Sequence, residues 1–291
     1  MNAPRFAPPP AAVVDADVAA ALAEDIGTGD ATAMLLDDAP DSAYLLCKED
    51  CVLAGRPWFE ACHRALDPGV AFHWRFDEGD RIAKGQVVAT LRGRNRALVT
   101  AERASLNFLQ TLSGTATTTA RHVDAVRGTG ATILDTRKTI PGLRIAQKYA
   151  VRVGGGGNHR IGLYDAVMLK ENHIRAFGSV AAAIERARAL HPALPLIVEV
   201  ETLAQLREAL DTGCTRILID DFDADTRREA VRIAKAAPYA GRIPLEVSGG
   251  VDLASLRGIA DDGVDCISIG GLTKHVHAID FSLKLGPPPT A

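Results

Sequence analysis

LPLIVEVETLAQLREALDTGCTRILIDD, residues 194–221, places two strand-like runs on either side of one helical run. The apolar runs Leu194–Val200 and Thr215–Asp220 are short and rich in Ile, Leu and Val, which is typical of buried strands. Between them, Thr202 precedes a stretch with three leucines at helical spacing, and Gly213 ends it. A strand, a helix and a second strand in this order predict a βαβ unit in a parallel sheet.

The same rhythm continues through the C-terminal half of the chain. The six strand-like runs are Ala131–Asp135, Asp165–Lys170, Leu194–Val200, Thr215–Asp220, Ile243–Val247 and Val264–Ile269. Ser179 and Asp252 each precede a further helical pattern. Either an open doubly wound sheet or an α/β barrel would fit. Polar residues follow most of these runs, and barrel enzymes build their sites at that one face, so the barrel is favoured.

The N-terminal part has a different pattern. Short helices, one of them around Arg56–Ala65, alternate there with the strand candidates AYLLCKED and VAFHWRF, and a long helix from about Ala101 to Val126 joins the two parts. The Pro-rich start, MNAPRFAPPPAA, predicts a disordered lead-in. The expected division is therefore a lead-in over 1–14, an N-terminal domain over 15–115, a catalytic barrel over 116–275 and a segment over 276–291 that packs back on the N-terminal domain.

The composition excludes several classes of protein. The net charge of −3 and the pI near 6.2 argue against a nucleic-acid or anionic-membrane binder, which usually has a basic domain. No apolar run approaches the ~20 residues needed to span a bilayer, and no signal-peptide core is present. Five scattered cysteines without a CxxC pair predict free thiols in a reducing cytoplasm.

A basic island lies within this mildly acidic chain, at residues 135–173. It holds seven Lys/Arg and two His against three acidic side chains. A focused cluster of this kind indicates an anion site. The cations that could bind a dicarboxylate together with phosphates are Arg103, Arg137, Lys138, His159, Arg160 and Lys170. Arg144, Lys148 and Arg152 recur at four-residue steps, so they are predicted to form a solvated helix face instead.

Acidic residues and glycines complete the candidate site. Glu199, Glu201 and Asp220 end two successive strands, where Mg²⁺ or ribose hydroxyls would find oxygen ligands. Because strand side chains alternate, Glu199 and Glu201 are expected to point the same way. The turns at 248–250 and 268–271 follow strands with SGG and SIGG, which suits phosphate capture by backbone N–H groups.

Taken together, these motifs resemble quinolinate phosphoribosyltransferase. The resemblance rests on DTRKTIPGLR, KYAVRVGGGGNHRIGLYDAVMLKENH, EVE, SGG and ISIGGLTKHVHAIDFSLKL, with EDIGTGD and ERASLNFLQTLSGTAT in the N-terminal part. It spans residues 20–285. It implies a type II phosphoribosyltransferase fold, with an N-terminal α/β sandwich domain and an incomplete, about seven-stranded α/β barrel. It also implies a homodimer, or a hexamer built as a trimer of dimers, whose active sites are shared between subunits.

The resemblance also implies roles for individual residues. The quinolinate-binding residues would be Thr136, Arg137, His159, Arg160 and Lys170, with Arg103 supplied by the neighbouring subunit. The residues that bind phosphoribosyl pyrophosphate would be Lys138, Glu199, Glu201, Asp220, Ser248, Gly249, Gly250, Ser268, Gly270 and Gly271. Lys138, Lys170, Glu199 and Asp220 would be catalytic, and Glu199 and Asp220 would hold Mg²⁺ through water. The sequence departs from the family at Asp220–Asp221, where the family usually has Asp-Asn.

The activity implied is the transfer of phosphoribosyl to quinolinate with loss of CO₂, a cytoplasmic step of de novo NAD biosynthesis. One alternative is a paralogous phosphoribosyltransferase with another acceptor, such as the protein encoded with molybdate transport systems. A non-catalytic barrel that binds a phosphorylated metabolite is a second alternative. The third is an aldolase that uses Lys170 as a Schiff base.

Overall fold

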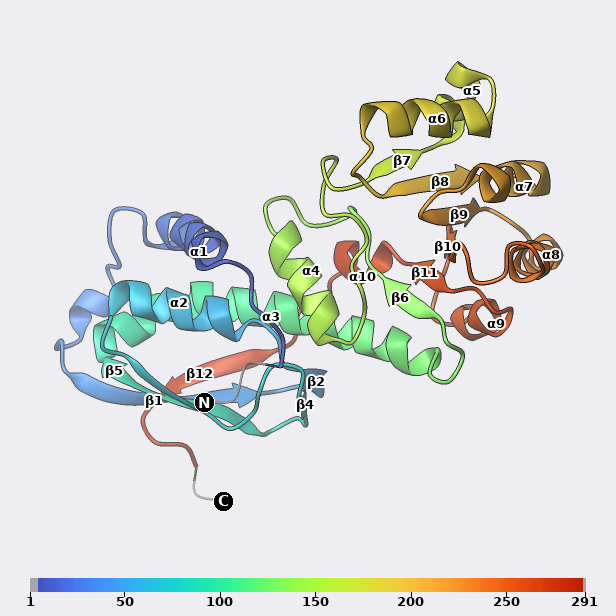
Figure 1. Ribbon diagram of the computed structural model, residues 1–291. Helices are drawn as coiled ribbons and strands as arrows, with labels where there is room; N and C mark the ends of the chain where they lie inside the picture. The colour runs from blue at the N-terminus through green and yellow to red at the C-terminus, as the bar shows by residue number, and fades with distance from the viewer. Residues whose placement is uncertain (1–4, 290–291) are drawn as a thin grey trace. The chain divides into compact units, whose positions relative to one another are not determined.

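The chain forms two compact units (Figure 1). The computed structural model describes residues 5–289. The first unit comprises the described residues up to Ala120, the segment Thr139–Gly155 and the described residues from Gly271 onward. The second comprises Arg121–Lys138 and Gly156–Gly270. The two units therefore interleave along the chain, whereas the expected domains ran one after another.

An antiparallel sheet forms the base of the first unit. Its order is β12-β1-β5-β3. The strands are β1 (Pro40–Cys47), β3 (Ala71–Trp74), β5 (Val87–Arg94) and β12 (Phe281–Leu285), and β2 (Cys51–Val52) pairs separately with β4 (Arg81–Ile82). Strand β12 pairs with β1 from Ala43↔Leu285 to Cys47↔Phe281.

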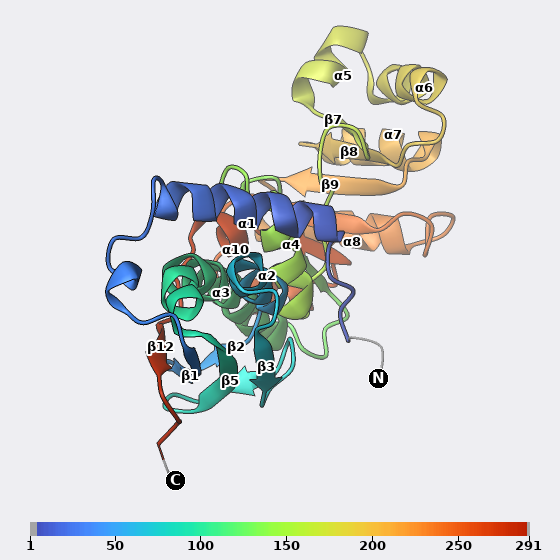
Figure 2. The same ribbon diagram turned by 90° about the vertical axis from the view of Figure 1, so that its left-hand side faces the viewer.

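Helices cover one face of this sheet in two layers (Figure 2). The helices are α1 (Ala11–Ile26), α2 (Arg56–Leu66), α3 (Asn95–Ala125), α4 (Arg144–Val153) and α10 (Gly271–Lys274), with the 3₁₀ turn η1 (Ala33–Leu35). Phe59 of α2 and three leucines of α3 pack on the sheet in one apolar cluster. The opposite sides of α2 and α3 pack with α1 and α4 in a second cluster, centred on Trp58 and Tyr149.

Residues 5–10 contact other parts of the first unit before helix α1 begins. Helix α1 begins at Ala11 and buries Val14, Val18 and Leu22. Before it, a Cβ added to Gly79 would lie 2.7 Å from the Phe6 ring, and Arg152 Nη2 donates to the carbonyl oxygen of Ala7 at 3.0 Å. The prediction of a disordered lead-in over 1–14 is therefore wrong for residues 5–14, while residues 1–4 lie outside the described part.

Helix α3 can pass very close to another segment because it carries a glycine in its middle. A Cβ on Gly114 would lie directly against the carbonyl oxygen of His277. Two residues further along that segment, Ile279 N donates to Gln110 O at 3.1 Å, so the chain that leads into β12 is bound to the surface of α3. Only glycine, which has no Cβ, therefore fits at position 114.

A six-stranded parallel sheet organises the second unit. Its order is β6-β11-β10-β9-β8-β7. The strands are β6 (Thr132–Leu134), β7 (Val167–Leu169), β8 (Leu196–Val200), β9 (Arg216–Asp220), β10 (Leu245–Ser248) and β11 (Cys266–Ser268). All six predicted strands are confirmed. An isolated parallel bridge between Leu134 and Gly157 lies beyond β6, so a one-residue seventh position extends the sheet. The incomplete barrel is therefore confirmed as six strands plus this bridge.

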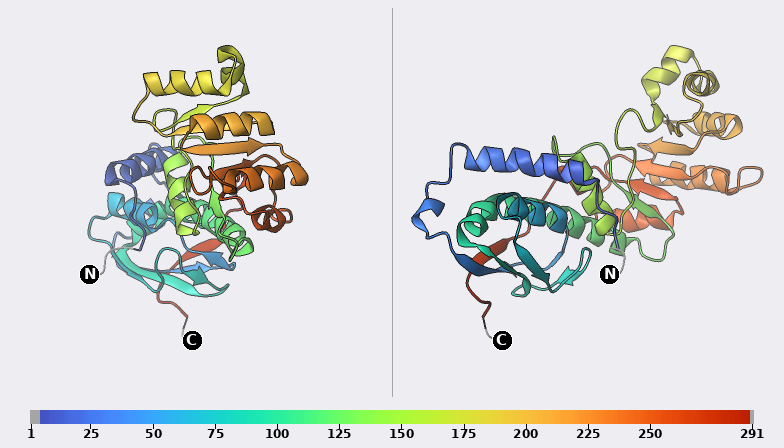
Figure 3. Two further views of the ribbon diagram at one scale, coloured as in Figure 1. Left: turned by 45° about the vertical axis from the view of Figure 1, so that its right-hand side comes forward. Right: turned by 60° about the vertical axis from the view of Figure 1, so that its left-hand side comes forward.

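Helices follow one another along the outer side of this sheet (Figure 3). They are α5 (Glu171–Phe177), α6 (Val180–Leu190), α7 (Leu203–Thr212), α8 (Ala224–Lys235) and α9 (Leu256–Asp261). Ser179 caps α6 by accepting from Ala182 N, and Thr202 caps α7 by accepting from Gln205 N, as their sequence positions predict. Helix α9 starts four residues after Asp252, whose carboxylate bonds Ser255 instead.

The strand register sorts side chains between the two faces of the sheet. Met168 lies beside Ile197, and Glu246 lies beside Leu218, so these four residues share the inner face, which is the barrel lumen. Ala166, Met168, Ile197 and Leu218 form a small apolar cluster there. Glu246 shares this face with two other charged residues, Arg216 and Glu199, which lie beside Ile197 and Leu218.

Candidate active site

The candidate site lies at the C-terminal edge of the parallel sheet. Lys170 follows β7, Glu199 lies near the end of β8, and Asp220 is the last residue of β9. Ser248 and Ser268 end β10 and β11. Because all six strands run the same way, these ends meet at one edge, as in barrel enzymes. The structure thus brings together residues that are up to about a hundred positions apart in the sequence.

Lys170 and Glu199 form an ion pair across neighbouring strands. Lys170 Nζ lies 2.7 Å from Glu199 Oε2, and the Glu199 side chain is only 9% exposed. This contact engages the Lys170 side chain with a carboxylate of the neighbouring strand.

The carboxyl group of Asp220 lies near two other carboxylates. Burial raises the pKa of its carboxyl above the usual value, and the nearby carboxylates of Glu199 and then Asp221 raise it further. Glu201 lies beyond the end of β8 and is exposed, and its backbone N–H donates to Gln205 Oε1 at 2.8 Å. Glu199 is instead buried against Lys170, so the two glutamates do not share one environment.

The structure gives the unusual Asp221 a geometric role. Its backbone is left-handed, with φ at 52°, a conformation that Asn and Asp adopt more readily than other residues with side chains. A Cβ added to Gly249 would lie 2.7 Å from Asp221 Oδ1, so this carboxylate faces the glycine turn after β10. Both Asp and Asn therefore suit the backbone here, and Asp adds a negative charge beside the turn.

Glycines allow close packing at the turns after β10 and β11. Gly249 and Gly250 have φ of 89° and 53°, which side chains disfavour. A Cβ on Gly270 would lie 2.8 Å from Lys138 Cδ and 3.4 Å from Thr136 Oγ1. Gly270 therefore allows the Lys138 side chain to lie against the turn after β11. Gly271 is the next residue and begins α10.

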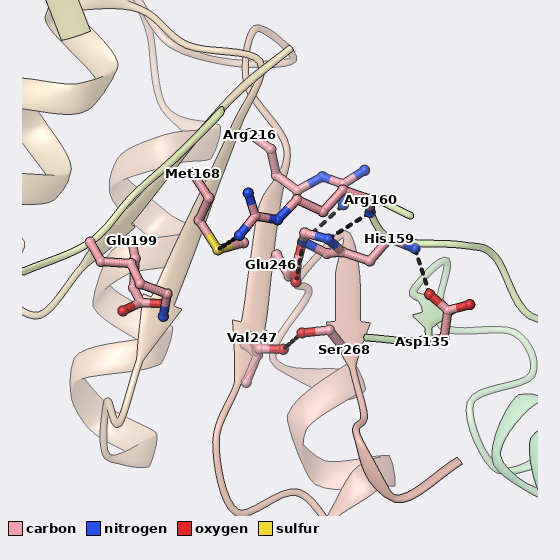
Figure 4. A network of polar contacts seen from close by, with 10 residues as sticks. Asp135, His159, Arg160, Met168, Glu199, Arg216, Glu246, Val247 and Ser268 are labelled. Carbon is pink, nitrogen blue, oxygen red and sulfur yellow. Dashed lines mark hydrogen bonds and ion pairs between the residues drawn. The ribbon is translucent and has the colours of Figure 1, made fainter. Parts of the chain in front are cut away.

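Two guanidinium groups lie close together in the second unit. Burial lowers the pKa of Arg160, and the positive charge of Arg137 lowers it further. Arg160 Nη1 donates to the carbonyl oxygen of Ala166 at 3.0 Å, and its Nη2 lies 3.7 Å from Met168 Sδ (Figure 4). A bound anion would offset this effect of Arg137 on Arg160.

His159 directs both ring nitrogens toward protein groups. Its Nδ1 accepts from the backbone N–H of Arg160 at 2.8 Å, and its Nε2 lies 3.4 Å from Glu246 Oε1. Its own backbone N–H donates to Asp135 Oδ1 at 2.9 Å, and its side chain is 6% exposed. Figure 4 shows the ring between Glu246 and Arg160.

Sequence reasoning missed Glu246 and Arg216. Glu246 is fully buried, and Arg216 Nη1 donates to its Oε2 at 2.9 Å. Burial raises the pKa of Glu246, but the polar groups of His159, Ser268 and Arg216 nearby outweigh that effect and hold the pKa below its usual value. The available signal was a glutamate inside the otherwise apolar strand LEVS.

The remaining cations belong to the first unit. Arg103 lies on α3 and is exposed. Arg144, Lys148 and Arg152 share α4, as their spacing predicts. Lys148, however, is 2% exposed, so the prediction of a solvated face is wrong for this residue. Its helix neighbours Tyr149 and Ala150 are also buried.

The residues that could hold Mg²⁺ are Glu199 and Asp220. Within residues 5–289, no three His, Cys, Asp or Glu side chains converge closely enough to chelate a metal ion. The raised pKa of Asp220 nevertheless shows negative charge that a cation would relieve. The donor set thus fits an ion held through water and through oxygens of a bound substrate.

Family models match nearly the whole chain. The quinolinate phosphoribosyl transferase N-terminal domain matches residues 29–113, and the corresponding C-terminal domain matches residues 115–284.

Relatives match over similar lengths. A probable carboxylating nicotinate-nucleotide pyrophosphorylase of Synechocystis is 41% identical over 97% of this chain and 96% of its own. The probable enzyme of the same name from Bacillus subtilis is 41% identical, covering 90% of each chain. The solved nicotinate-nucleotide pyrophosphorylase of Francisella tularensis superposes with a TM-score of 0.92 at 41% identity, over 98% of this chain and 100% of that one.

Proposed function

Because this chain belongs to the quinolinate phosphoribosyltransferase family, we propose that Arg137, Arg160 and Lys170 bind the two carboxylates of quinolinate. The chain catalyses transfer of phosphoribosyl from phosphoribosyl pyrophosphate to quinolinate with decarboxylation, the step that yields nicotinate mononucleotide in de novo NAD biosynthesis. The observation that carries the binding proposal is the position of Arg137 beside Arg160, where its positive charge lowers the pKa of Arg160 and where a dianion would offset that effect. Thr136 lies next to Arg137 and completes the set, and His159 acts behind Arg160.

The turns after β10 and β11, together with the carboxylates at the ends of β8 and β9, would bind phosphoribosyl pyrophosphate. Backbone N–H groups at Ser248–Gly250 and at Ser268–Gly271 suit its 5′-phosphate, and Lys138 at Gly270 suits its pyrophosphate. Glu199, Glu201 and Asp220 would meet the ribose hydroxyls. Glu199 and Asp220 would also hold Mg²⁺ through water, and a bound Mg²⁺ would neutralise charge on the leaving pyrophosphate.

The reaction needs charge stabilisation and orientation more than a protein nucleophile. The C1–oxygen bond of the ribose breaks, and pyrophosphate leaves with the electron pair, beside Lys138. The pyridine nitrogen of quinolinate then forms a bond to C1 and becomes cationic. The bond from C2 to its carboxylate breaks next, CO₂ leaves, and a proton takes its place on C2. Fixed cations that orient the dicarboxylate would place nitrogen and C1 for reaction.

We propose that two copies of the chain share each active site. Arg103 is exposed on α3 and available to a neighbouring subunit. Large apolar side chains are also exposed, which is typical of surfaces that another chain covers. The most exposed of them are Met34, Leu35, Leu163 and Tyr164, at 65%, 83%, 71% and 72%. A dimer, alone or within a hexamer, would cover them. We also propose a cytoplasmic location, which the five free cysteines favour.

A mixing experiment tests the shared site. Arg103→Ala and Arg137→Ala should each be inactive alone. A 1:1 mixture that exchanges subunits should recover about a quarter of wild-type activity, because half the dimers are mixed and each has one intact site. The control is a mixture of the same two variants in which each was cross-linked before mixing, so that subunits cannot exchange. No recovery after exchange would contradict a site built from two subunits.

A coupled assay tests the reaction and the cation together. Quinolinate loss, followed by absorbance, should match released CO₂ one to one in the presence of phosphoribosyl pyrophosphate and Mg²⁺. EDTA should abolish turnover, and added Mg²⁺ should restore it. Tight binding of phosphoribosyl pyrophosphate without quinolinate loss would instead favour a paralogue with another acceptor.

A further inference from the structure

Glu246 is the buried carboxylate on the inner face of β10, two residues before the turn at Ser248. It is fully buried, and its strand neighbours on the same face are Leu218 and Cys266. Burying a carboxylate is unfavourable unless charged or polar groups compensate for it. A glutamate at such a position therefore requires a structural or functional reason.

The two carboxylate oxygens of Glu246 have different partners. Oε2 accepts from Arg216 Nη1 at 2.9 Å, and Arg216 is the first residue of β9, at the N-terminal edge of the sheet. Oε1 faces His159 Nε2 at 3.4 Å. Arg216 neutralises the charge, while the contact to His159 points toward the anion site.

The hydrogen bond at the other ring nitrogen defines the tautomer of His159. Nδ1 accepts the backbone N–H of Arg160 at 2.8 Å, so Nδ1 carries no proton. The ring proton therefore lies on Nε2 and faces the carboxylate of Glu246. The Asp135 carboxylate fixes the residues just before Arg160. It accepts from His159 N at 2.9 Å and from Asn158 Nδ2 at 2.6 Å.

We propose that Glu246 is a positioning residue for substrate binding, which acts through His159 to hold Arg160 in the orientation that binds a pyridine dicarboxylate. The contacts run from Glu246 Oε1 to His159 Nε2, and from His159 Nδ1 to the backbone of Arg160 (Figure 4). The Arg160 side chain then spans to the carbonyl oxygen of Ala166. In this arrangement His159 does not bind the substrate itself but holds Arg160, which does. The inference rests on the proposed role of Arg160 in quinolinate binding.

Glu246→Gln is the variant that removes the charge and keeps the volume. A glutamine can accept from His159 Nε2 only by turning its NH₂ group toward Arg216, which is itself a donor. If the amide is reversed, its NH₂ group meets the protonated Nε2 of His159. Either orientation breaks one contact, so the orientation of His159 is no longer unique.

The expected result is a selective loss of quinolinate binding. Glu246→Gln should raise the KM for quinolinate by about tenfold to a hundredfold, the range for groups that orient a binding residue from behind. The KM for phosphoribosyl pyrophosphate should stay within about twofold, because Ser268, which interacts with Glu246 through its side chain, is proposed to bind that substrate through its backbone N–H. In a His159→Asn background, the same substitution should have little further effect.

Asp262→Asn is the matched control. Asp262 pairs with Arg227 at 2.7 Å, and both side chains are largely buried, but no histidine links this pair to the anion site. This variant should lower the thermal midpoint without changing the KM for quinolinate. If Glu246→Gln behaves in the same way, Glu246 is a purely structural residue and the proposal is overturned.

Two further measurements distinguish a failure of the role proposed for Glu246 from a failure of the role proposed for Arg160. Arg160→Lys should itself raise the KM for quinolinate; if it does not, the role proposed for Arg160 fails, whatever Glu246 does. If Glu246→Gln does not fold, ¹⁵N spectra of histidine-labelled wild-type protein provide the test. They should show His159 protonated at Nε2 only, and unchanged in tautomer when quinolinate binds. A proton on Nδ1 would overturn the proposal.

Discussion

Arg137→Ala is expected to abolish turnover of quinolinate and to leave the fold intact. Arg137 follows β6 and lies close enough to Arg160 to lower the pKa of that guanidinium. A guanidinium that binds a carboxylate through two charge-assisted hydrogen bonds contributes about 1.5–3 kcal/mol for each bond. Losing both corresponds to a decrease of about 10²- to 10⁴-fold in kcat/KM.

The fold should survive this substitution for an electrostatic reason. Without its anion, the Arg137–Arg160 pair is repulsive, so removal of one member relieves a cost in the free protein. The circular dichroism spectrum and the thermal midpoint should therefore match the wild type or exceed it. Arg232→Ala, which removes an exposed arginine on α8 that pairs with Glu229, is the control and should keep full activity. Near-normal turnover by Arg137→Ala would refute the assigned role.

Gly114→Ala is expected to destabilise the first unit severely. Its new methyl group would lie directly against the carbonyl oxygen of His277, a backbone atom that no rotamer change can move. Alanine favours a helix over glycine by about 1 kcal/mol, but a clash with backbone costs more. We expect a net loss of at least about 3 kcal/mol in the free energy of unfolding, or insoluble protein.

Gly258→Ala provides the matched control for this prediction. Gly258 lies in α9, and a Cβ added there would meet nothing within 4 Å. This variant should gain stability, by about 0.5–1 kcal/mol, from helix propensity alone. Urea unfolding followed by circular dichroism compares the two variants. Because Trp58 and Trp74 both lie in the first unit, tryptophan fluorescence reports that unit specifically. Equal midpoints for Gly114→Ala and wild type would disprove the steric argument.

The parallel sheet could be predicted because its signals are local. Each strand is a short apolar run, and caps such as Ser179 and Thr202 mark where the next helix begins. The first helix was missed because the prolines before Ala11 resemble a disordered segment. Val14, Val18 and Leu22, at four-residue steps, were a usable signal for an amphipathic helix.

The site could be predicted in its composition but not in its contacts. Strand ends identify Lys170, Glu199 and Asp220, since charged residues that follow apolar runs reach the same edge of a sheet. Sequence spacing cannot reveal that Lys148 faces inward, because that depends on which side of α4 packs against other helices. It also cannot pair Glu246 with His159, which lie 87 positions apart and meet only across the barrel lumen.

The pairing of β1 with β12 has a consequence for how the protein is made. On the ribosome, β1 at Pro40–Cys47 emerges long before β12 at Phe281–Leu285, and the complete second unit is synthesised between them. During that interval one edge of β1 has no partner, and an unpaired strand edge can pair with other chains. The sheet of the first unit can therefore be completed only after β12 has been synthesised, so nascent chains that lack β12 should depend on chaperones more than chains that contain it.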